Sequence, residues 1–206
     1  MFKKTILFLV FFTICYYSWG QNSRIGQWKS WLHHNNGVWV TQSENKVIYS
    51  TGNGILTIDK IDASLETLTR VDGLSSVTTG PLIFDPISQN LLLSYSDGNI
   101  DIVNDEEIKN LNYISENTSI TGSKQVNNLR HDGEGTVYLA MDFGLVQVDM
   151  VEKVFGFTLF TPYEVKDVCI HDGFIYLTNG ENVYRAPKNL GFPHGDLSQW
   201  ESLKQN

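Results

Sequence analysis

The sequence has 206 residues, and its 23 acidic side chains outnumber the 15 basic ones, so the formal net charge is −8. Proteins that bind nucleic acid carry clustered Lys and Arg, and no basic stripe is present in this chain. The composition therefore excludes nucleic acid as a partner.

The first 20 residues have the anatomy of a secretory signal peptide. A basic start at Lys3 and Lys4 is followed by the apolar stretch 6–17, and small residues precede a cleavage point after Gly20. A membrane-spanning helix needs roughly 20 apolar residues, and this apolar stretch is shorter, which favours a cleaved signal. A retained membrane anchor is the alternative. We therefore expect a signal peptide over residues 1–20 and export to the periplasm or the outer cell surface.

The chain has two cysteines, and Cys15 lies inside the expected signal. A lipoprotein would need a small residue before the modified cysteine, whereas Ile14 precedes this one. After cleavage Cys169 alone would remain, so no internal disulfide could form. Because Cys169 lies between apolar neighbours, we interpret it as a small buried hydrophobe rather than a catalytic thiol.

Four segments of the chain resemble one another, and each reads as an apolar strand, a polar or glycine-bearing turn and a second strand. These segments are residues 45–59, 90–103, 135–149 and 173–186. Gly54, Gly98 and Gly144 occupy the same place in the first three turns, and Asn182 stands there in the fourth. Glycine and asparagine are the residues that tolerate a positive φ. We therefore expect the same tight turn in every repeat.

Each segment has a further strand before it and a more polar strand after it, which makes a unit of four strands in about 40–45 residues. This period is typical of a propeller blade. The second strands, such as "LLLSY" at 91–95, are apolar on both faces, so each sheet needs cover on both sides. The sequence thus predicts an all-β fold of four-stranded antiparallel blades, roughly at residues 37–72, 80–115, 126–161 and 165–203.

The segment 25–31 resembles residues 197–203 around a shared Gln-Trp pair. If 197–203 is the outer strand of the fourth blade, 25–31 is an outer strand without a blade of its own. We therefore expect residues 21–206 to form the N-terminal part of a propeller, with four blades and one unpaired outer strand of a larger, seven-bladed ring. A closed four-bladed ring is the alternative.

Two "HDG" segments are the most tempting candidates for chemistry, at His131–Asp132 and His171–Asp172. Both fall between the first and second strands of their units, where Asp-Gly favours a type I′ turn. No third ligand is evident, so we interpret both as turns. The adjacent His33 and His34 would point to opposite faces of a strand, and they rarely share a metal ion in that arrangement. His194 lies alone in a Pro/Gly loop.

Carboxylates in the turns are a second set of candidate functional residues. Residues 104–107, "NDEE", have the composition of a solvated turn and lack the spacing of a calcium loop. Asp97, Asp142 and Glu181 lie in the inner turns, where a propeller glycoside hydrolase or lyase would place paired carboxylates. Turns favour Asp for other reasons, and no catalytic motif is present. We predict no enzyme, no cofactor, no metal and no catalytic or cofactor-binding residues.

Several motifs carry a family resemblance. Residues 70–86, with "GLSS" and "DP", are similar to the repeat of two-component-regulator propellers. Taken in order along the chain, four further motifs resemble the N-terminal propeller of the PorZ family of the type IX secretion system of Gram-negative bacteria. These motifs are "IGQWKSWL" at 25–32, "GNIDIV" at 98–103, "SITGSKQVNNL" at 119–129 and "YLAMDFGLVQVDMVEK" at 138–153.

The resemblance implies a secreted or cell-surface protein with two propellers and a C-terminal β-sandwich. It further implies a non-catalytic role in an attachment complex that processes and anchors cargo, with a sortase-like partner and other type IX proteins. Recognition of anionic lipopolysaccharide is also implied by the family. The alternatives are a periplasmic sensor propeller of a two-component regulator and a propeller glycoside hydrolase or lyase.

Overall fold

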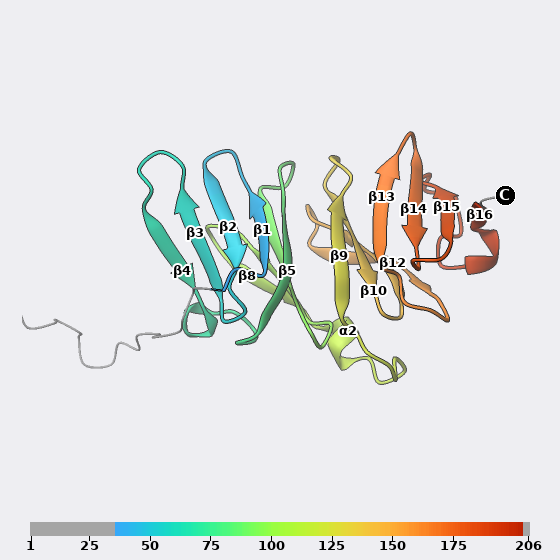
Figure 1. Ribbon diagram of the computed structural model, residues 1–206, viewed down its shortest axis with the longest axis horizontal. Coiled ribbons are helices and arrows are strands. Elements are labelled where there is room, and N and C mark those ends of the chain that lie inside the picture. The colour runs from blue at the N-terminus through green and yellow to red at the C-terminus, as the bar shows by residue number, and fades with distance from the viewer. Residues whose placement is uncertain (1–35, 204–206) are drawn as a thin grey trace, which may run out of the picture.

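The computed structural model describes residues 36–203, which form four separate four-stranded antiparallel sheets (Figure 1). We call the sheets blades 1 to 4 in chain order. Blade 1 contains β1 (Trp39–Gln42), β2 (Lys46–Ser50), β3 (Ile55–Asp59) and β4 (Leu65–Leu68). Blade 2 contains β5 (Thr79–Asp85), β6 (Asn90–Tyr95), β7 (Ile100–Val103) and β8 (Ile108–Leu111). Blade 3 contains β9 (Val126–His131), β10 (Thr136–Met141), β11 (Gly144–Asp149) and β12 (Val154–Phe160). Blade 4 contains β13 (Asp167–His171), β14 (Phe174–Thr178), β15 (Val183–Pro187) and β16 (Glu201–Leu203).

The strands of each blade are hydrogen-bonded in the order in which they occur along the chain. The first strands lie next to one another, because β1 contacts β5, β5 contacts β9 and β9 contacts β13. The sheets follow one another along the molecule, with blades 1 and 4 at its opposite ends (Figure 1). The prediction of a partial propeller is thereby confirmed. A closed four-bladed ring, the alternative, is not formed by residues 36–203.

Three apolar cores lie between successive blades, and they form because the second strand of each inner blade is apolar on both of its faces. All six residues of β6 are buried, as are five of the six residues of β10. Leu91 and Leu93 pack in the core between blades 1 and 2, whereas Leu92 between them packs in the core between blades 2 and 3. Alternate side chains of one strand thus serve two interfaces, as the period of two in a strand requires.

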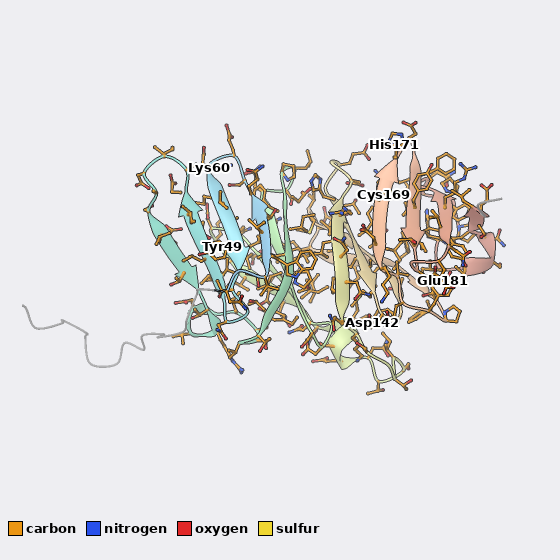
Figure 2. The ribbon with its side chains drawn as sticks, viewed as in Figure 1. Tyr49, Lys60, Asp142, Cys169, His171 and Glu181 are labelled. Carbon is orange, nitrogen blue, oxygen red and sulfur yellow. The ribbon has the colours of Figure 1, made fainter. Side chains whose placement is uncertain are left out.

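The two end blades bury one face each. The burial of β14 alternates along the strand, with Ile175 and Leu177 buried against blade 3 and their neighbours partly exposed. On blade 1, Val40 is 68% exposed beside its cross-strand partner Tyr49 (Figure 2). We expect further blades of a larger ring to cover these two faces. The outer strand predicted at 25–31 lies outside the described residues.

Helices are short in the described part of the chain. They are α2 (Tyr113–Glu116) and the two 3₁₀ turns η1 (Arg70–Asp72) and η2 (Leu197–Gln199). No helix among residues 36–203 has the length and apolar character that crossing a membrane requires.

The positive φ expected in the inner turns is present at the three glycines and absent at Asn182 of the fourth blade. Gly54, Gly98 and Gly144 have φ values of 158°, 80° and 147°. Asn182 is not among the residues with a positive φ, and Gly180 adopts that conformation instead, at 94°. The Asn179 side chain accepts hydrogen bonds from the backbone N–H groups of residues 181 and 182. This side-chain turn moves the positive φ two residues earlier than the alignment of repeats suggested.

Candidate functional site

The second HDG segment is a two-residue hairpin turn. His171 pairs with Phe174 across it, and the two residues between them, Asp172 and Gly173, have φ values of 47° and 75°. Two successive positive φ values define the predicted type I′ turn. His171 Nε2 lies 3.3 Å from Asp172 Oδ2, and both side chains are exposed (Figure 2). The pair is therefore a solvated feature of the turn.

The first HDG segment differs from the prediction. Asp132 N donates to Thr136 O, which leaves a loop of three residues, and Gly133 and Gly135 have the positive φ values. Asp132 Oδ1 accepts hydrogen bonds from the backbone N–H groups of Glu134 and Thr136. The turn is thus built by the aspartate side chain, and the prediction of a type I′ turn is wrong at this position.

Asp132 also joins two blades. Its side chain is fully buried, and Lys188 Nζ, at the end of β15 in blade 4, lies 2.8 Å from Asp132 Oδ2 and 2.6 Å from Glu134 Oε2. Burial raises the pKa of Asp132, but the hydrogen bonds from Lys188 and the turn's backbone N–H groups outweigh that effect and lower it. We call this arrangement the Lys188 clasp.

Removing the clasp is expected to weaken the junction between blades 3 and 4. Lys188→Met leaves a buried carboxylate without its cation and should reduce the free energy of unfolding by about 1–3 kcal/mol at neutral pH. The pKa of Asp132 in the folded protein is lower than the ordinary aspartate pKa of 3.8. The stabilisation is therefore complete at pH values above 3.8, and it is lost as the pH falls through the lowered pKa of the folded protein. Urea unfolding from pH 7 to pH 3 should show the two proteins converging in acid. Lys166→Met, whose partner Glu164 is exposed, is the matched control and should cost under about 0.5 kcal/mol.

Cys169 is exposed, and the prediction of a buried residue is wrong. It lies on the uncovered face of blade 4 opposite Tyr176, whereas its neighbours Val168 and Ile170 face blade 3 (Figure 2). A small side chain on a period-two strand is buried only if a sheet packs against its own face. Partial burial and the nearby charge of Asp167 raise the pKa of the thiol, which keeps it protonated at neutral pH and a poor nucleophile.

The remaining histidines do not assemble a site. His33 and His34 lie outside the described residues. His194 stacks on Phe157 with ring centroids 4.6 Å apart, and its Nε2 lies 2.8 Å from Pro187 O. Its backbone carbonyl accepts the indole N–H of Trp200 at 3.1 Å. His194 is therefore a packing residue of the outer loop of blade 4.

The three candidate carboxylates lie in separate turns. Asp142 and Glu181 lie along the lower edge of the molecule, opposite the edge that carries His171 (Figure 2). Asp97 Oδ1 accepts the backbone N–H of Asn99, and Asp142 Oδ1 accepts from Asn127 Nδ2 at 2.9 Å. Residues 36–203 contain no group of three or more His, Cys, Asp or Glu side chains that could hold a metal ion. These carboxylates act in their own turns.

A polar hollow is the better candidate for a binding site. It has a volume of about 820 Å³ and lies where the first strands of blades 1, 2 and 3 meet, β1, β5 and β9. Trp39 and Phe84, both partly buried, contribute aromatic surface. The polar side chains that line it include Gln42, Lys60, Gln89, Asn128, Arg130 and His131.

The charged side chains of this hollow are two cations, Lys60 and Arg130, and the carboxylate of Glu44. Lys60 Nζ donates to Gln42 Oε1 at 3.1 Å and to Ser43 O at 2.7 Å, which holds the ammonium at the upper edge (Figure 2). Arg130 is half-exposed and lies 3.5 Å from Asp167 Oδ2 of blade 4. Amide groups, an aromatic ring and a guanidinium can together hydrogen-bond, stack against and neutralise a polar anionic ligand. Sequence reasoning missed this hollow, because its residues come from three distant repeats.

Sequence reasoning also missed a buried polar network. Asp101, in the apolar strand β7, is fully buried and accepts hydrogen bonds from Ser75 N, Ser75 Oγ, Tyr95 OH and Asn110 Nδ2 at 2.5–2.8 Å. Burial, together with this hydrogen bond, raises the pKa of Tyr95. Ser75 belongs to the "GLSS" step between blades 1 and 2, so the network fixes that connection. An acidic residue between Ile100 and Ile102 was the available signal.

Four consecutive four-stranded antiparallel blades, whose first strands lie next to one another, define the chain as part of a β-propeller. The family described as "TSS9, PorZ, N-terminal beta-propeller domain" matches residues 47–201, and the chain belongs to this family. The family predicted from the sequence motifs is confirmed.

Solved structures show the same fold. PorZ of Porphyromonas gingivalis, described as an essential bacterial surface component of the type-IX secretion system, matches with a TM-score of 0.78 and 20% identity over 87% of this chain and 24% of its own. The extracellular domain of BT4673 from B. thetaiotaomicron, described as a one-component system, matches with a TM-score of 0.62 and 17% identity over 84% of this chain and 24% of its own. The chain spans about a quarter of the length of both proteins. A search of curated proteins found no match.

Proposed function

We propose that this chain is a non-catalytic propeller module of the attachment complex of the type IX secretion system. The observation that carries the proposal is the family match over residues 47–201. In this role the module is exported to the periplasm or the outer cell surface. It supports the processing and anchoring of cargo together with other type IX proteins, including a sortase-like partner.

The hollow at β1, β5 and β9 is the surface that we assign to recognition of anionic lipopolysaccharide. Sugar hydroxyls hydrogen-bond to amide side chains such as Gln89 and Asn128, and the ring of Trp39 offers a stacking surface. Phosphate or carboxylate groups on the glycan suit a guanidinium, and Arg130 supplies one on β9. The chemistry of the lining thus supports a polar anionic ligand.

Binding to lipopolysaccharide tests the glycan part of the proposal. Arg130→Ala is expected to weaken the binding of purified anionic lipopolysaccharide roughly tenfold, the loss of about 1.4 kcal/mol. Lys166→Ala removes a cation from an exposed site outside the hollow and serves as the charge-matched control. Equal affinities of the two variants, measured by biolayer interferometry, would place the glycan elsewhere.

The role in the secretion system has its own test. We expect the full-length protein, purified from cell envelopes under mild conditions, to bring type IX components with it. Their absence from the purified material would contradict the proposal irrespective of the lipopolysaccharide result.

The two alternatives rest on weaker grounds. A sensor propeller is supported by likeness of fold to BT4673 at 17% identity, which speaks for the architecture alone. A propeller hydrolase or lyase would use Asp97, Asp142 and Glu181, yet Asp142 is held by Asn127 in its own blade. We propose that the chain is no enzyme, and hydrolysis of a glycan that disappears in Asp142→Asn would overturn this.

A further inference from the structure

A second hollow lies between blades 1 and 2 and is not used by the function proposed above. It is a groove of about 1020 Å³, lined by β2, β3 and β4 of blade 1 and by β5, β6, β7 and β8 of blade 2. The outermost strands of the two blades, β4 and β8, both contribute to its walls. The groove therefore follows the junction of two neighbouring sheets out to the rim of the propeller.

The floor of the groove is apolar and incompletely covered. Leu68, Phe84, Val103 and Ile108 line it, and each packs against the core between blades 1 and 2 while remaining only partly buried. A partner that covers this open apolar surface removes it from water, which favours binding.

The rim of the groove is acidic. Five carboxylates line it against the single cation of Lys46, which lies 3.5 Å from Glu66. These carboxylates are Glu66, Asp72, Asp105, Glu106 and Glu107. Lys153 of blade 3 neutralises Glu107 and lowers its pKa. Asp105 and Glu106 are exposed and form no ion pair among the residues that the structure describes.

The other two junctions are closed by ion pairs where this one is not. Lys153 of blade 3 reaches Glu107 of blade 2 at 2.5 Å, and the Lys188 clasp joins blade 4 to blade 3. Within residues 36–203 no ion pair crosses from blade 1 to blade 2. Of the five carboxylates on this rim, Glu66 pairs with Lys46 and Glu107 pairs with Lys153, whereas Asp105 and Glu106 have no ion pair within residues 36–203.

A free strand edge borders the groove as well. Since β4 ends its sheet, one edge of its backbone has no strand partner among residues 36–203. Its residues Leu65–Leu68 are mostly exposed, and three of them line the groove. An extended peptide can add to such an edge through main-chain hydrogen bonds while its alternate side chains enter a neighbouring groove.

We propose that this groove docks an extended segment of a partner protein in which Lys or Arg alternates with apolar residues. The apolar side chains cover Leu68, Phe84 and Ile108, and the cations meet Asp105 and Glu106. Charge complementarity identifies the occupant, because the rim carries five carboxylates against the single ammonium of Lys46, and Asp105 and Glu106 form no ion pair within residues 36–203. The inference does not rest on the proposed function, since it concerns a surface of this chain alone.

The probe is a fluorescein-labelled nine-residue peptide of alternating lysine and valine, added to the whole exported chain. We expect saturable binding by fluorescence anisotropy. Neutralising the rim with Glu66→Gln, Asp105→Asn and Glu106→Gln should weaken this binding at least tenfold. The matched control neutralises three exposed carboxylates outside the groove, with Glu152→Gln, Asp172→Asn and Glu181→Gln, and should change the affinity less than twofold.

Three outcomes would overturn the proposal. Equal losses in the two triple variants would mean general attraction of a cation to an acidic protein. A lysine–serine peptide that binds as well as the lysine–valine peptide would show that the apolar floor is not used. Binding that appears only after residues 21–35 are deleted would mean that the chain's own basic and tryptophan-containing segment fills the groove. A photo-crosslinker at Thr57, which lines the groove, should capture the peptide in the unmodified background.

Discussion

Gly144→Ala is expected to prevent blade 3 from forming. Gly144 begins β11 with a φ of 147°, and a Cβ atom added to it would lie 1.8 Å from Leu159 O, a backbone atom of the adjacent strand β12. Because the three nearest atoms all belong to the backbone, no side-chain rotation can relieve the overlap, and the paired strands must separate. We expect a loss of more than about 4 kcal/mol, a large part of the 5–15 kcal/mol that stabilises an ordinary domain.

The control for this variant separates the overlap from the backbone conformation. Gly133 also has a positive φ, of 78°, but an added Cβ atom meets nothing within 4 Å. Gly133→Ala should therefore cost only the strain of a left-handed residue, roughly 1 kcal/mol. Chemical denaturation followed by tryptophan fluorescence gives both values. Similar losses in the two variants would refute the close approach of β11 and β12 at Gly144.

Asp101→Ala is expected to have the second largest effect. The substitution removes a fully buried carboxylate that accepts four hydrogen bonds, and it leaves the buried Tyr95 OH and the two donors of Ser75 without that acceptor. Unpaired buried polar groups cost about 1–3 kcal/mol each, so we expect a total loss of roughly 3–5 kcal/mol. The "GLSS" connection at Ser75 should loosen at the same time, because both its N–H and its hydroxyl lose their acceptor.

Two measurements check the role of Asp101. Urea unfolding gives the loss of stability. Amide hydrogen exchange should be accelerated by Asp101→Ala more at Ser75 than at buried residues of blade 4. Asp105→Ala, an exposed carboxylate of the same blade, is the matched control and should change stability by less than about 0.5 kcal/mol. Unchanged exchange at Ser75 in Asp101→Ala would argue against the network as the anchor of this connection.

Candidate residues show where reasoning from the sequence succeeded and where it failed. The turn at His171 was predicted correctly because Asp-Gly between two strands is a local signal. The same three letters at His131 form a different turn, in which Asp132 Oδ1 accepts the backbone N–H groups of Glu134 and Thr136. Asp132 also contacts Lys188, which lies 56 positions further along the chain. Cys169 was expected to be buried. It is exposed, because no sheet among residues 36–203 covers the face of β13 on which it lies. Local turn chemistry was predictable, and contacts between blades were not.

The amino-acid sequence by itself determined the all-β class, the four repeats, the strand order within each blade and the family. These features follow from period-two patterns, turn residues and ordered motifs, all of which act between residues close in the chain. Tertiary structure alone decided the polar hollow, the Lys188 clasp, the Asp101 network and the acidic groove. Each of these joins side chains from different repeats, and their distances depend on how neighbouring sheets pack, which no local pattern encodes.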